Sequence, residues 1–549
     1  MIILNANAQT CQWAKRGGYN CQEAGTSLCA DNVGSIYVTG DFCDSISFDS
    51  ITLHNANFAN IFIAKYDTNG NVIWARNVIP YNIAHGGVGS NGICTDPFGN
   101  FYVTGYYDSD SISFDSIKLY NNNVPWQNIF LAKFNANGNV IWVKNIESLT
   151  NRLSTSIFCD ANGNVFIGAE FEGPSLTLGS ITLHNDYSPI NDVFIAKYDS
   201  AGNILWAKNA RNVNRNGSFS QQVNCDRWGN IYFTGTFECD SISFGSITLH
   251  NGNHGSNYPN FFIVKMDTNG NELWAKSSNC RYEDASGGIS TDNNGNVYYG
   301  GWFGNDSISL GNITLYNHGM ADPFLVKYDS SGNVLWARNA TGHGEGEVMN
   351  ISTDNYGNTY LTGRYRDTIY FGSYILPSIP IGLNYYIFVV KYDTQGNVSW
   401  VKSTGGIDFD EGSWINADNF GNIYVTGTFH SATINFDNII LSNYNIVNND
   451  YFIAKLHDNT ERAGIMDIAS HINGISIYPN PAKNTLNIHQ SSTSPNEQVI
   501  ITDILGHQVY KAPLTAIDNT IELMKWSNGV YFYEVKSEKE SLRGKFIKQ

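Results

Sequence analysis

A phrase that recurs every 62 to 66 residues restricts the fold of this 549-residue chain more than any other feature. Each copy contains Asp-x-x-Gly-Asn-x-Tyr-x-Thr-Gly or a close variant of it. The copies begin at Asp31, Asp96, Asp160, Asp226, Asp292, Asp354 and Asp418. Self-similarity at a fixed period is the signature of a repeat architecture, so we expect seven structural units of nearly equal length.

A second phrase predicts a β-hairpin in each unit. Residues 61–77 read IFIAKYDTNGNVIWARN, in which two runs of β-branched and aromatic residues flank a turn. Asp67 opens the turn by accepting hydrogen bonds from the nearby backbone, and Gly70 supplies the left-handed residue. Both faces of these strands are apolar, which is expected when each small sheet lies between two others. Trp74 then fills the gap between neighbouring sheets.

Each unit contains three further strand patterns. In the second unit they are a short apolar run at residues 92–95, a strand at 101–104 and an additional hairpin of the form Asp-Ser-Ile-Ser-Phe at 110–121. The first two join the opening hairpin to give four main strands per unit. Four strands repeated at this period are typical of the blades of a β-propeller.

The seventh copy of the opening hairpin is incomplete. Residues 452–455 (FIAK) have no tryptophan strand after them, whereas residues 12–15 (QWAK) are a tryptophan strand with no partner before them. Propellers hide their last sheet edge when the two chain ends complete one blade together. The sequence therefore predicts an all-β fold: a seven-bladed β-propeller closed by the N-terminal strand, followed by a small C-terminal β-sandwich of the Ig-like type.

These patterns divide the chain into four segments. Residues 1–8 are interpreted as the end of a signal peptide, because Ala6, Asn7 and Ala8 have the form of a signal-peptidase site. We expect the propeller over 9–455, a polar linker over 456–473 and the C-terminal domain over 474–549, where alternating apolar runs are separated by turns. No apolar run is long enough to form a transmembrane helix.

The net charge and the positions of the cysteines limit which ligands, disulfides and metal sites are plausible. The formal net charge is −17, which disfavours nucleic acid because an acidic surface repels phosphate backbones. Most of the nine cysteines occupy repeat positions, where buried thiols are expected, because equivalent positions on different blades lie too far apart to bond. Only Cys11, Cys21 and Cys280, in or near variable loops, are plausible disulfide partners. No Cys-x-x-Cys spacing suggests a metal site.

The C-terminal segment carries five short motifs in order: YPNP at 478–481, TLNI at 485–488, DILG at 503–506, SNGVY at 527–531 and KFIK at 545–548. With them, the last 76 residues resemble the type A C-terminal sorting domain of the type IX secretion system of Bacteroidota. The motif residues singled out by this resemblance are Tyr478, Pro479, Asn480, Pro481, Gly506, Gly529, Tyr531 and Lys545.

The resemblance implies an export route for the protein. It implies Sec export through the periplasm, recognition by the outer-membrane translocon, and removal of the domain by a sortase-like processing enzyme. The mature protein would then be secreted or anchored at the outer face of the outer membrane. The units from Gln12 to Lys455 also resemble SBBP-type β-propeller repeats, from which they depart by the additional hairpin; this resemblance implies the fold and little about a ligand.

Acidic residues recur at the entry to the short apolar strand of several units. That strand should line the central channel. The acids should therefore lie at the mouth of the channel, on the face that carries the variable loops. Converging carboxylates there could hold a divalent cation, or a cationic or polyhydroxylated ligand. The alternative is that they are solvated turn carboxylates in an acidic protein. The candidate site residues are Glu23, Asp284, Glu345, Glu347, Asp410 and Glu411.

Catalytic motifs are missing from the sequence. There is no Gly-x-Ser-x-Gly elbow, His-Glu-x-x-His pair or phosphate-binding loop, and the Asp-x-Asn-Gly-Asn turns lack the further oxygen ligands that calcium requires. We therefore interpret the chain as a binding or adhesion module for an extracellular glycan or protein, with no catalytic residue assigned. Two alternatives stay open: a polysaccharide lyase or hydrolase that uses two acids at the channel mouth, and a structural surface protein.

Overall fold

The computed structural model describes residues 9–18, 21–55, 59–81, 87–150, 156–213, 217–251, 258–278, 284–304, 306–377, 384–418, 421–458, 475–478, 482, 484–490, 498–503, 506–536 and 541–548. The regular structure in these residues is β-strand, and none of them is helical. The expectation of an all-β chain is therefore confirmed. The chain divides into two compact units, Met1–Asn459 and Thr460–Gln549, which are described separately.

In the first unit, an antiparallel arrangement of four strands occurs seven times over the described residues. The innermost strands are β2 (Ala24–Ala30), β8 (Val88–Thr95), β14 (Ser156–Cys159), β21 (Ser218–Cys225), β27 (Asp284–Thr291), β34 (Glu345–Thr353) and β40 (Asp410–Ala417). The second strands are β3 (Ile36–Phe42), β9 (Phe101–Tyr107), β15 (Val165–Phe171), β22 (Ile231–Phe237), β28 (Val297–Phe303), β35 (Thr359–Arg366) and β41 (Asn422–Phe429).

The outer half of the first six sheets is the hairpin predicted from the second phrase, and in the last sheet β1 stands in place of the second hairpin strand. The third strands are β6 (Asn60–Tyr66), β12 (Gln127–Phe134), β18 (Asp192–Tyr198), β25 (Asn260–Met266), β31 (Asp322–Tyr328), β38 (Tyr386–Tyr392) and β44 (Asp450–Asp458). The outermost strands are β7 (Val72–Tyr81), β13 (Val140–Thr150), β19 (Ile204–Asn209), β26 (Glu272–Ser277), β32 (Val334–Asn339), β39 (Val398–Thr404) and β1 (Gln9–Gly17).

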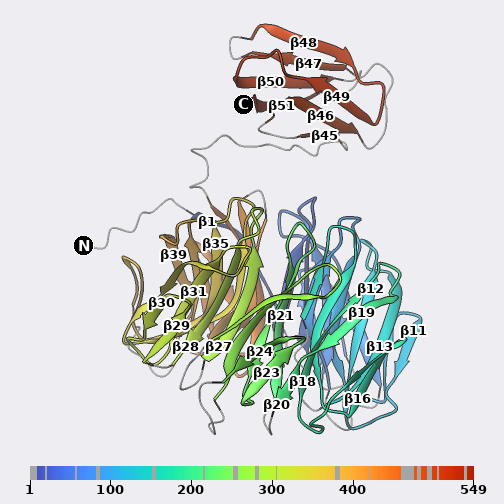
Figure 1. Ribbon diagram of the computed structural model, residues 1–549, viewed down its shortest axis with the longest axis vertical. Coiled ribbons are helices and arrows are strands. Elements are labelled where there is room, and N and C mark those ends of the chain that lie inside the picture. Colours follow the sequence, from blue (N-terminus) through green and yellow to red (C-terminus); the bar gives the residue numbers. More distant parts are fainter. Residues whose placement is uncertain are drawn as a thin grey trace. The chain divides into compact units, whose positions relative to one another are not determined.

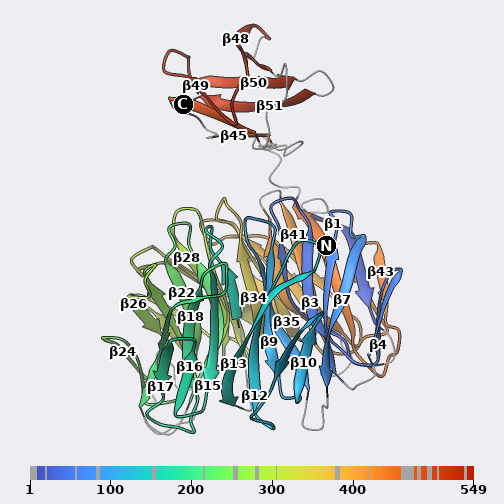
Figure 2. The same ribbon diagram turned by 90° about the vertical axis from the view of Figure 1, so that its right-hand side faces the viewer.

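The sheets of this unit stand side by side in chain order, as the progression from blue to orange in Figures 1 and 2 shows. Each innermost strand contacts the innermost strand of the next sheet, and β40 contacts β2 of the first sheet. Small antiparallel sheets that stand side by side, with their innermost strands in contact, are typical of a β-propeller.

Strand β1 belongs to the sheet that also contains β40, β41 and β44. It pairs antiparallel with β44, so that Trp13 lies opposite Lys455 and Gly17 lies opposite Tyr451. In Figure 2 the blue and orange strands of the first and last sheets are accordingly adjacent. Residues from the two ends of the unit therefore share one sheet.

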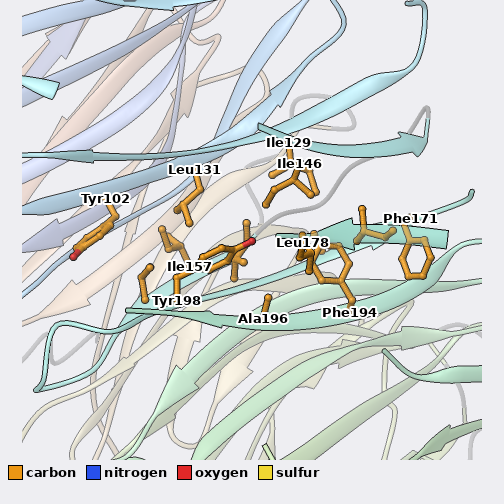
Figure 3. Close-up of a cluster of buried hydrophobic side chains, with 14 of the residues drawn as sticks. Tyr102, Ile129, Leu131, Ile146, Ile157, Phe171, Leu178, Phe194, Ala196 and Tyr198 are labelled. Carbon is orange, nitrogen blue, oxygen red and sulfur yellow. The ribbon is translucent and has the colours of Figure 1, made fainter. Parts of the chain in front are cut away.

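Hydrophobic cores lie between neighbouring sheets. One core brings together Tyr102 and Leu131 of the second sheet with Phe171 and Phe194 of the third, and all four side chains are fully buried (Figure 3). A strand buried on both faces needs apolar residues on both, which explains why these strands do not alternate between apolar and polar residues.

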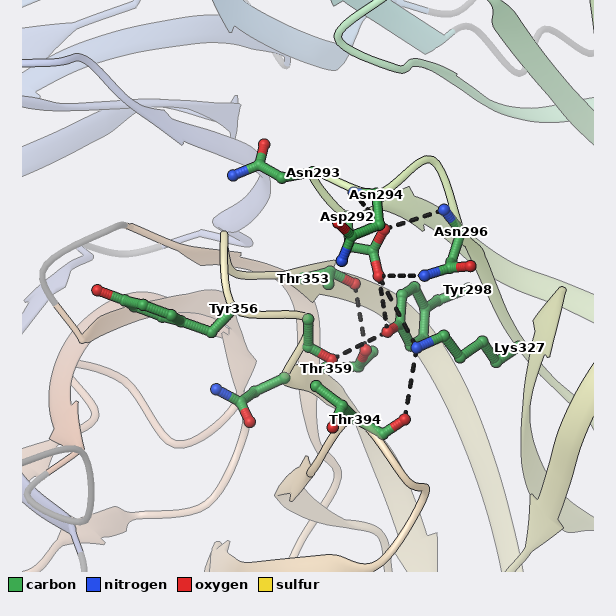
Figure 4. Close-up of polar contacts among 12 residues, drawn as sticks. Asp292, Asn293, Asn294, Asn296, Tyr298, Lys327, Thr353, Tyr356, Thr359 and Thr394 are labelled. Carbon is green, nitrogen blue, oxygen red and sulfur yellow. Dashed lines mark hydrogen bonds and ion pairs between the residues drawn. The ribbon is translucent and has the colours of Figure 1, made fainter. Parts of the chain in front are cut away.

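In six of the seven sheets, a lysine and a tryptophan join the sheet to the next one. Lys65 of β6 and Trp74 of β7 both donate hydrogen bonds to the carbonyl oxygen of Ala136, in the turn between β12 and β13, at 3.3 Å each. We call this pair of bonds the lysine–tryptophan clasp. Five more clasps have the same form, each made to a backbone carbonyl oxygen: Lys133 and Trp142 donate to Ser200, Lys197 and Trp206 to Thr268, Lys265 and Trp274 to Ser330, Lys327 and Trp336 to Thr394, and Lys455 and Trp13 to Thr68. Figure 4 includes the bond from Lys327 to Thr394.

The clasp differs at the junction between the sheet of β38 and the sheet of β44. Lys391 donates to the Asp458 carboxylate at 2.5 Å, and the indole nitrogen of Trp400 has no hydrogen-bond partner among the described residues. The reason is that β44 and β1 come from separate parts of the chain, so the last sheet has no turn whose carbonyl could accept both bonds.

The additional hairpin occurs in all seven units over the described residues. The hairpins are β4 (Ser45–Phe48) and β5 (Ile51–His54), β10 (Ser111–Phe114) and β11 (Ile117–Tyr120), β16 (Ser175–Leu178) and β17 (Ile181–His184), β23 (Ser241–Phe244) and β24 (Ile247–His250), β29 (Ser307–Leu310) and β30 (Ile313–Tyr316), β36 (Ile369–Phe371) and β37 (Tyr374–Leu376), and β42 (Thr433–Phe436) and β43 (Ile439–Ser442). Three of them pair with the chain that leaves the preceding sheet, namely with β7, β20 (Arg211–Val213) and β33 (Thr341–Gly342).

One disulfide, between Cys21 and Cys43, corrects the expectation for the cysteines. Cys21 was a plausible partner, but Cys43 was expected to be a buried thiol because Cys239 occupies the same repeat position. The chain before β2 passes the end of β3, which brings the two Cα atoms within 5.6 Å. Cys239 and Cys11 are free thiols, and Cys280 lies outside the described residues.

The second unit contains two sheets. The strands of one sheet are β45 (Ile475–Tyr478), β46 (Thr485–Gln490) and β49 (Asp518–Glu522), and those of the other are β47 (Gln498–Thr502), β48 (Gln508–Pro513), β50 (Gly529–Lys536) and β51 (Ser541–Lys548). A common core includes Leu486 and Ile521 of the first sheet with Val499 and Phe546 of the second. Two small sheets around one core form a β-sandwich.

Several sorting-motif residues have clear places in this sandwich. Gly506 has a φ of +85° in a turn whose Asp503 accepts its N–H. Gly529 begins β50, and the Tyr531 hydroxyl donates to the Ser527 carbonyl at 2.9 Å. The backbones of Tyr478 and Lys545 pair with Asn487 and Phe532. Residues Pro479, Asn480 and Pro481 lie outside the described residues, as do residues 1–8 and most of the predicted linker.

Candidate functional site

Asp410, one of the predicted site residues, is fully buried at the start of β40. Its carboxylate accepts hydrogen bonds from the N–H groups of Gly406, His430 and Ser431 and from the Ser431 hydroxyl, at 2.7 to 3.1 Å. Burial raises the pKa of this carboxyl above its ordinary value, and these bonds oppose the shift. Asp410 therefore fastens the loop before β40 to the end of β41.

Glu23 is buried, although the sequence predicted an open position at a channel mouth. Glu23 lies just before β2 with only 1% of its surface exposed, and its N–H donates to the Asn449 carbonyl at 3.0 Å. Asp284 begins β27 and pairs with Phe303 through the backbone; its side chain lies outside what the structure describes.

The other three predicted acids come together around two arginines. Arg364 of β35 donates to Glu347 of β34 at 2.7 Å and to Glu411 of β40 at 2.8 Å. Arg366 forms an ion pair with Glu345. We call these five residues the arginine–glutamate cluster.

Two aromatic rings flank the arginine–glutamate cluster. The Arg364 guanidinium carbon lies 4.8 Å from the centroid of the Tyr385 ring and 5.2 Å from that of Phe409. The Tyr385 hydroxyl donates to Glu345 at 2.8 Å, and burial together with this bond raises its pKa to about 12. The pKa values of Glu347 and Glu411 are also raised, by burial above all, while Arg364 opposes the shift.

The arginines change what the acids can do. Three carboxylates and two guanidinium groups leave the cluster with one net negative charge, and each carboxylate is already paired. Within the described residues, no three histidine, cysteine or acidic side chains are arranged to hold a metal ion. Sequence reasoning missed the arginines; the signal was Arg364-Tyr365-Arg366, which replaces Asp41-Phe42-Cys43 of the first unit.

A cavity of about 380 Å³ lies among the innermost strands, at the end where they enter the Asp-x-x-Gly turns. All seven innermost strands contribute to its lining, and so do Arg227 and Asn293 of two turns. Its volume falls in the range of small-molecule sites. This cavity is separate from the arginine–glutamate cluster, none of whose members line it.

The polar side chains of the lining come mainly from four of the seven innermost strands. Strands β2, β8 and β14 contribute aliphatic side chains and the thiols of Cys29, Cys94 and Cys159, whose pKa values are raised by burial. The remaining strands contribute amides and hydroxyls, including Asn224, Ser290, Thr291, Asn350, Ser352 and Asn416. The signal was present in the sequence, where SLCA and GICT give way to SQQVNC and VMNIST.

Comparison with known proteins identifies the second unit. Residues 476–549 match the family described as the secretion system C-terminal sorting domain. The protein is therefore secreted and located at the outer-membrane surface, and the type IX secretion system processes it. Among the described residues, no helix has the length and hydropathy needed to cross a membrane.

The first unit has more distant relatives. The chain is 25% identical, over 62% of its length, to an uncharacterized WD repeat-containing protein of Acanthamoeba polyphaga mimivirus, and spans only 29% of that relative. Similar solved structures include the Pan2 WD40 domain of Neurospora crassa, at 8% identity over 78% of this chain and 88% of that one, with a TM-score of 0.38. Another is PorZ, a surface component of the type IX secretion system of Porphyromonas gingivalis, at 11% identity over 98% and 100% of the two chains, with a TM-score of 0.18.

Proposed function

We propose that this protein is a binding or adhesion module displayed at the cell surface, and that its first unit is a seven-bladed β-propeller closed by β1. The observation that carries the proposal is the cavity among the innermost strands, because its size and its mixture of apolar, amide and hydroxyl groups suit a small or extended polar ligand. The ligand is an extracellular glycan or protein.

Three observations support the closed ring. β1 completes the sheet of β44, β40 contacts β2, and Lys455 with Trp13 makes the same clasp to Thr68 that covalently continuous sheets make elsewhere. In this proposal the propeller covers 9–455, a linker covers 456–473 and the Ig-like sorting domain covers 474–549. The units are SBBP-like repeats of a Bacteroidota protein that is exported by the Sec route.

The arginine–glutamate cluster is proposed as a second polar contact surface. With its carboxylates paired and two aromatic rings beside it, this cluster suits a polyhydroxylated ligand better than a divalent cation. The pairing also weighs against the enzyme alternative, because a glycosidase needs one carboxyl free to protonate the leaving group and another free to act on the sugar.

Export is tested by deleting residues 474–549. The truncated protein is expected in the periplasm, whereas the full-length protein should reach the surface and lose its sorting domain to a sortase-like enzyme. Surface display without residues 474–549 would contradict the proposed route.

Binding is tested with cells that produce the full-length protein, on beads coated with polysaccharide or with fibronectin. Attachment should exceed that of a deletion strain and should fall when Asn416→Phe fills part of the cavity. Equal attachment of all three strains would contradict the binding role. Release of new reducing ends from the polysaccharide would instead support the enzyme alternative.

A further inference from the structure

The Asp-x-x-Gly turns follow the innermost strands at one end of the cavity. In the six turns that the structure describes in full, the aspartate accepts hydrogen bonds from the N–H groups of the third and fifth residues. In the fourth turn the buried Asp226 accepts hydrogen bonds from the N–H groups of Trp228 and Asn230, at 3.0 and 2.9 Å, and from the Tyr232 hydroxyl at 3.1 Å. Because this network fixes the backbone on both sides of the second and third turn residues, those two side chains are presented outward from a rigid base. We call these two positions the turn tip.

Figure 4 shows the same construction around Asp292. The dashed network joins Asp292 to Asn294, Asn296, Tyr298 and Lys327, whereas the side chains of Asn293 and Tyr356 project away from it. Asn293 lines the cavity, and Tyr356 occupies the third position of the next turn.

Three of the turn tips that the structure describes carry large aromatic rings that are mostly exposed. The exposed fraction is 69% for Phe98, 51% for Trp228 and 58% for Tyr356. Phe98 and Trp228 also contact the following turn: a Cβ added to Gly163 would lie 3.0 Å from Phe98, and one added to Gly295 would lie 2.6 Å from Trp228. The glycines thus leave room for rings that are held in place yet open to solvent.

The other turn-tip residues are uncharged, with one exception. Asn32, Asn162, Asn293, Asn294 and Asn355 are exposed amides, and Arg227 lies with its guanidinium carbon 4.6 Å from the Trp228 ring centroid. No carboxylate occurs among the described turn tips, in a chain with 49 acidic and 32 basic residues. This rim is therefore neutral to positive on an otherwise acidic protein.

We propose that these turn tips and the adjacent cavity form a carbohydrate-binding site, with sugar rings stacked on Trp228, Tyr356 and Phe98. A sugar presents an apolar C–H face to an aromatic ring and hydroxyl groups to its sides, where amides and Arg227 can donate and accept hydrogen bonds. The inference rests on the proposed binding function and assigns its ligand class.

The arrangement distinguishes a carbohydrate chain from a protein partner. The rings sit on separate turns with amides between them, whereas a protein hot spot is a contiguous, fully desolvated cluster. A nucleic acid could stack on the same rings, but the net charge of −17 would repel its backbone.

The test is affinity electrophoresis of the full-length protein in gels that contain hydroxyethylcellulose, xyloglucan, galactomannan, laminarin or polygalacturonate. We expect at least one polysaccharide to retard the protein, and Trp228→Ala to raise the dissociation constant tenfold or more. Tyr356→Ala and Phe98→Ala should weaken binding less. Trp126→Ala is the matched control, because Trp126 is 38% exposed and lies in the loop between β11 and β12 rather than on an Asp-x-x-Gly turn. Arg227→Gln should weaken binding to polygalacturonate more than to neutral polymers if the sugar is acidic.

Two results would overturn the inference. One is that none of the five polysaccharides retards the wild-type protein; the other is that Trp228→Ala and Trp126→Ala migrate like the wild type in a gel that does retard it. Cells that still attach to fibronectin-coated beads would then preserve the proposed binding function while excluding the carbohydrate site. Unchanged melting temperatures of the variants separate lost binding from lost folding.

Discussion

Trp13→Ala is the substitution that bears most directly on how the two ends of the first unit are joined. Trp13 is 8% exposed, stacks on Tyr66 with ring centroids 6.3 Å apart, and donates to the Thr68 carbonyl at 3.1 Å. Truncation of a buried tryptophan costs about 3–5 kcal/mol. The Thr68 carbonyl keeps its bond from Lys455, so loss of the indole donor adds about 1 kcal/mol at most.

The expected loss of stability is about 4 kcal/mol. A unit of about 450 residues has an unfolding entropy of about 0.9 kcal/mol/K, so the melting temperature should fall by about 4 °C. Calorimetry of the full-length protein measures this shift. Trypsin should also cut at Lys15 and Arg16 in the variant under conditions that leave the wild type intact, because β1 is held to its sheet only by non-covalent contacts.

Trp206→Ala is the matched control for this prediction. Trp206 makes the same bond, to Thr268 at 3.3 Å, from a strand that is covalently continuous with its sheet. The Trp206→Ala substitution should lower the melting temperature without exposing Lys15 to trypsin. A Trp13→Ala protein that melts within about 1 °C of the wild type and resists trypsin equally would refute the argument.

Three further predictions concern single interactions. Trp400→Phe and Trp336→Phe both shrink a buried side chain, but Trp336→Phe also loses a 3.1 Å bond and should cost about 1 kcal/mol more in urea unfolding, because the Trp400 indole nitrogen has no partner among the described residues. Burial raises the pKa of Asp192 to about 7, against about 4 in the unfolded chain, so the unfolded state loses its proton first and stability falls as pH rises from about 4 to 7. Asp192→Asn should remove that part of the decline between about pH 4 and pH 7, and parallel curves would contradict it. Arg364→Gln leaves the buried Glu347 and the part-buried Glu411 uncompensated and should cost about 3 kcal/mol, more at pH 8 than at pH 5. Arg76→Gln, which removes an exposed pair, should cost less than about 1 kcal/mol, and equal losses for the two arginines would contradict the cluster.

Much of the first unit follows from its repeats. The phrase at residues 61–77 places β6 and β7 because turn chemistry at Asp67 and Gly70 is local and is satisfied within the same few residues. The sequence shows the lysine and the tryptophan of the clasp as repeated residues, but it does not show the hydrogen bonds that they make. Its acceptor is a backbone carbonyl about 60 residues further along the chain, and no side chain marks that carbonyl.

The candidate site contains interactions that the repeat pattern does not predict. The positions of Glu347 and Glu411 were readable from the spacing of the acids, but their pairing with Arg364 depends on which neighbouring strand faces them. Cys43 was likewise judged by its repeat position, while its disulfide depends on the path of the one loop that carries Cys21. Interactions that break the repeat are set by three-dimensional neighbours, and those neighbours differ from unit to unit.

Native-state hydrogen exchange of the full-length protein tests the proposed closure most directly. Peptides that cover β1, residues 9–17, should be protected as strongly as those that cover β19, because both are outermost strands that pair with one neighbour and β19 is covalently continuous with its sheet. Exchange of the β1 amides within seconds, while β19 stays protected, would contradict a ring closed by the N-terminal strand.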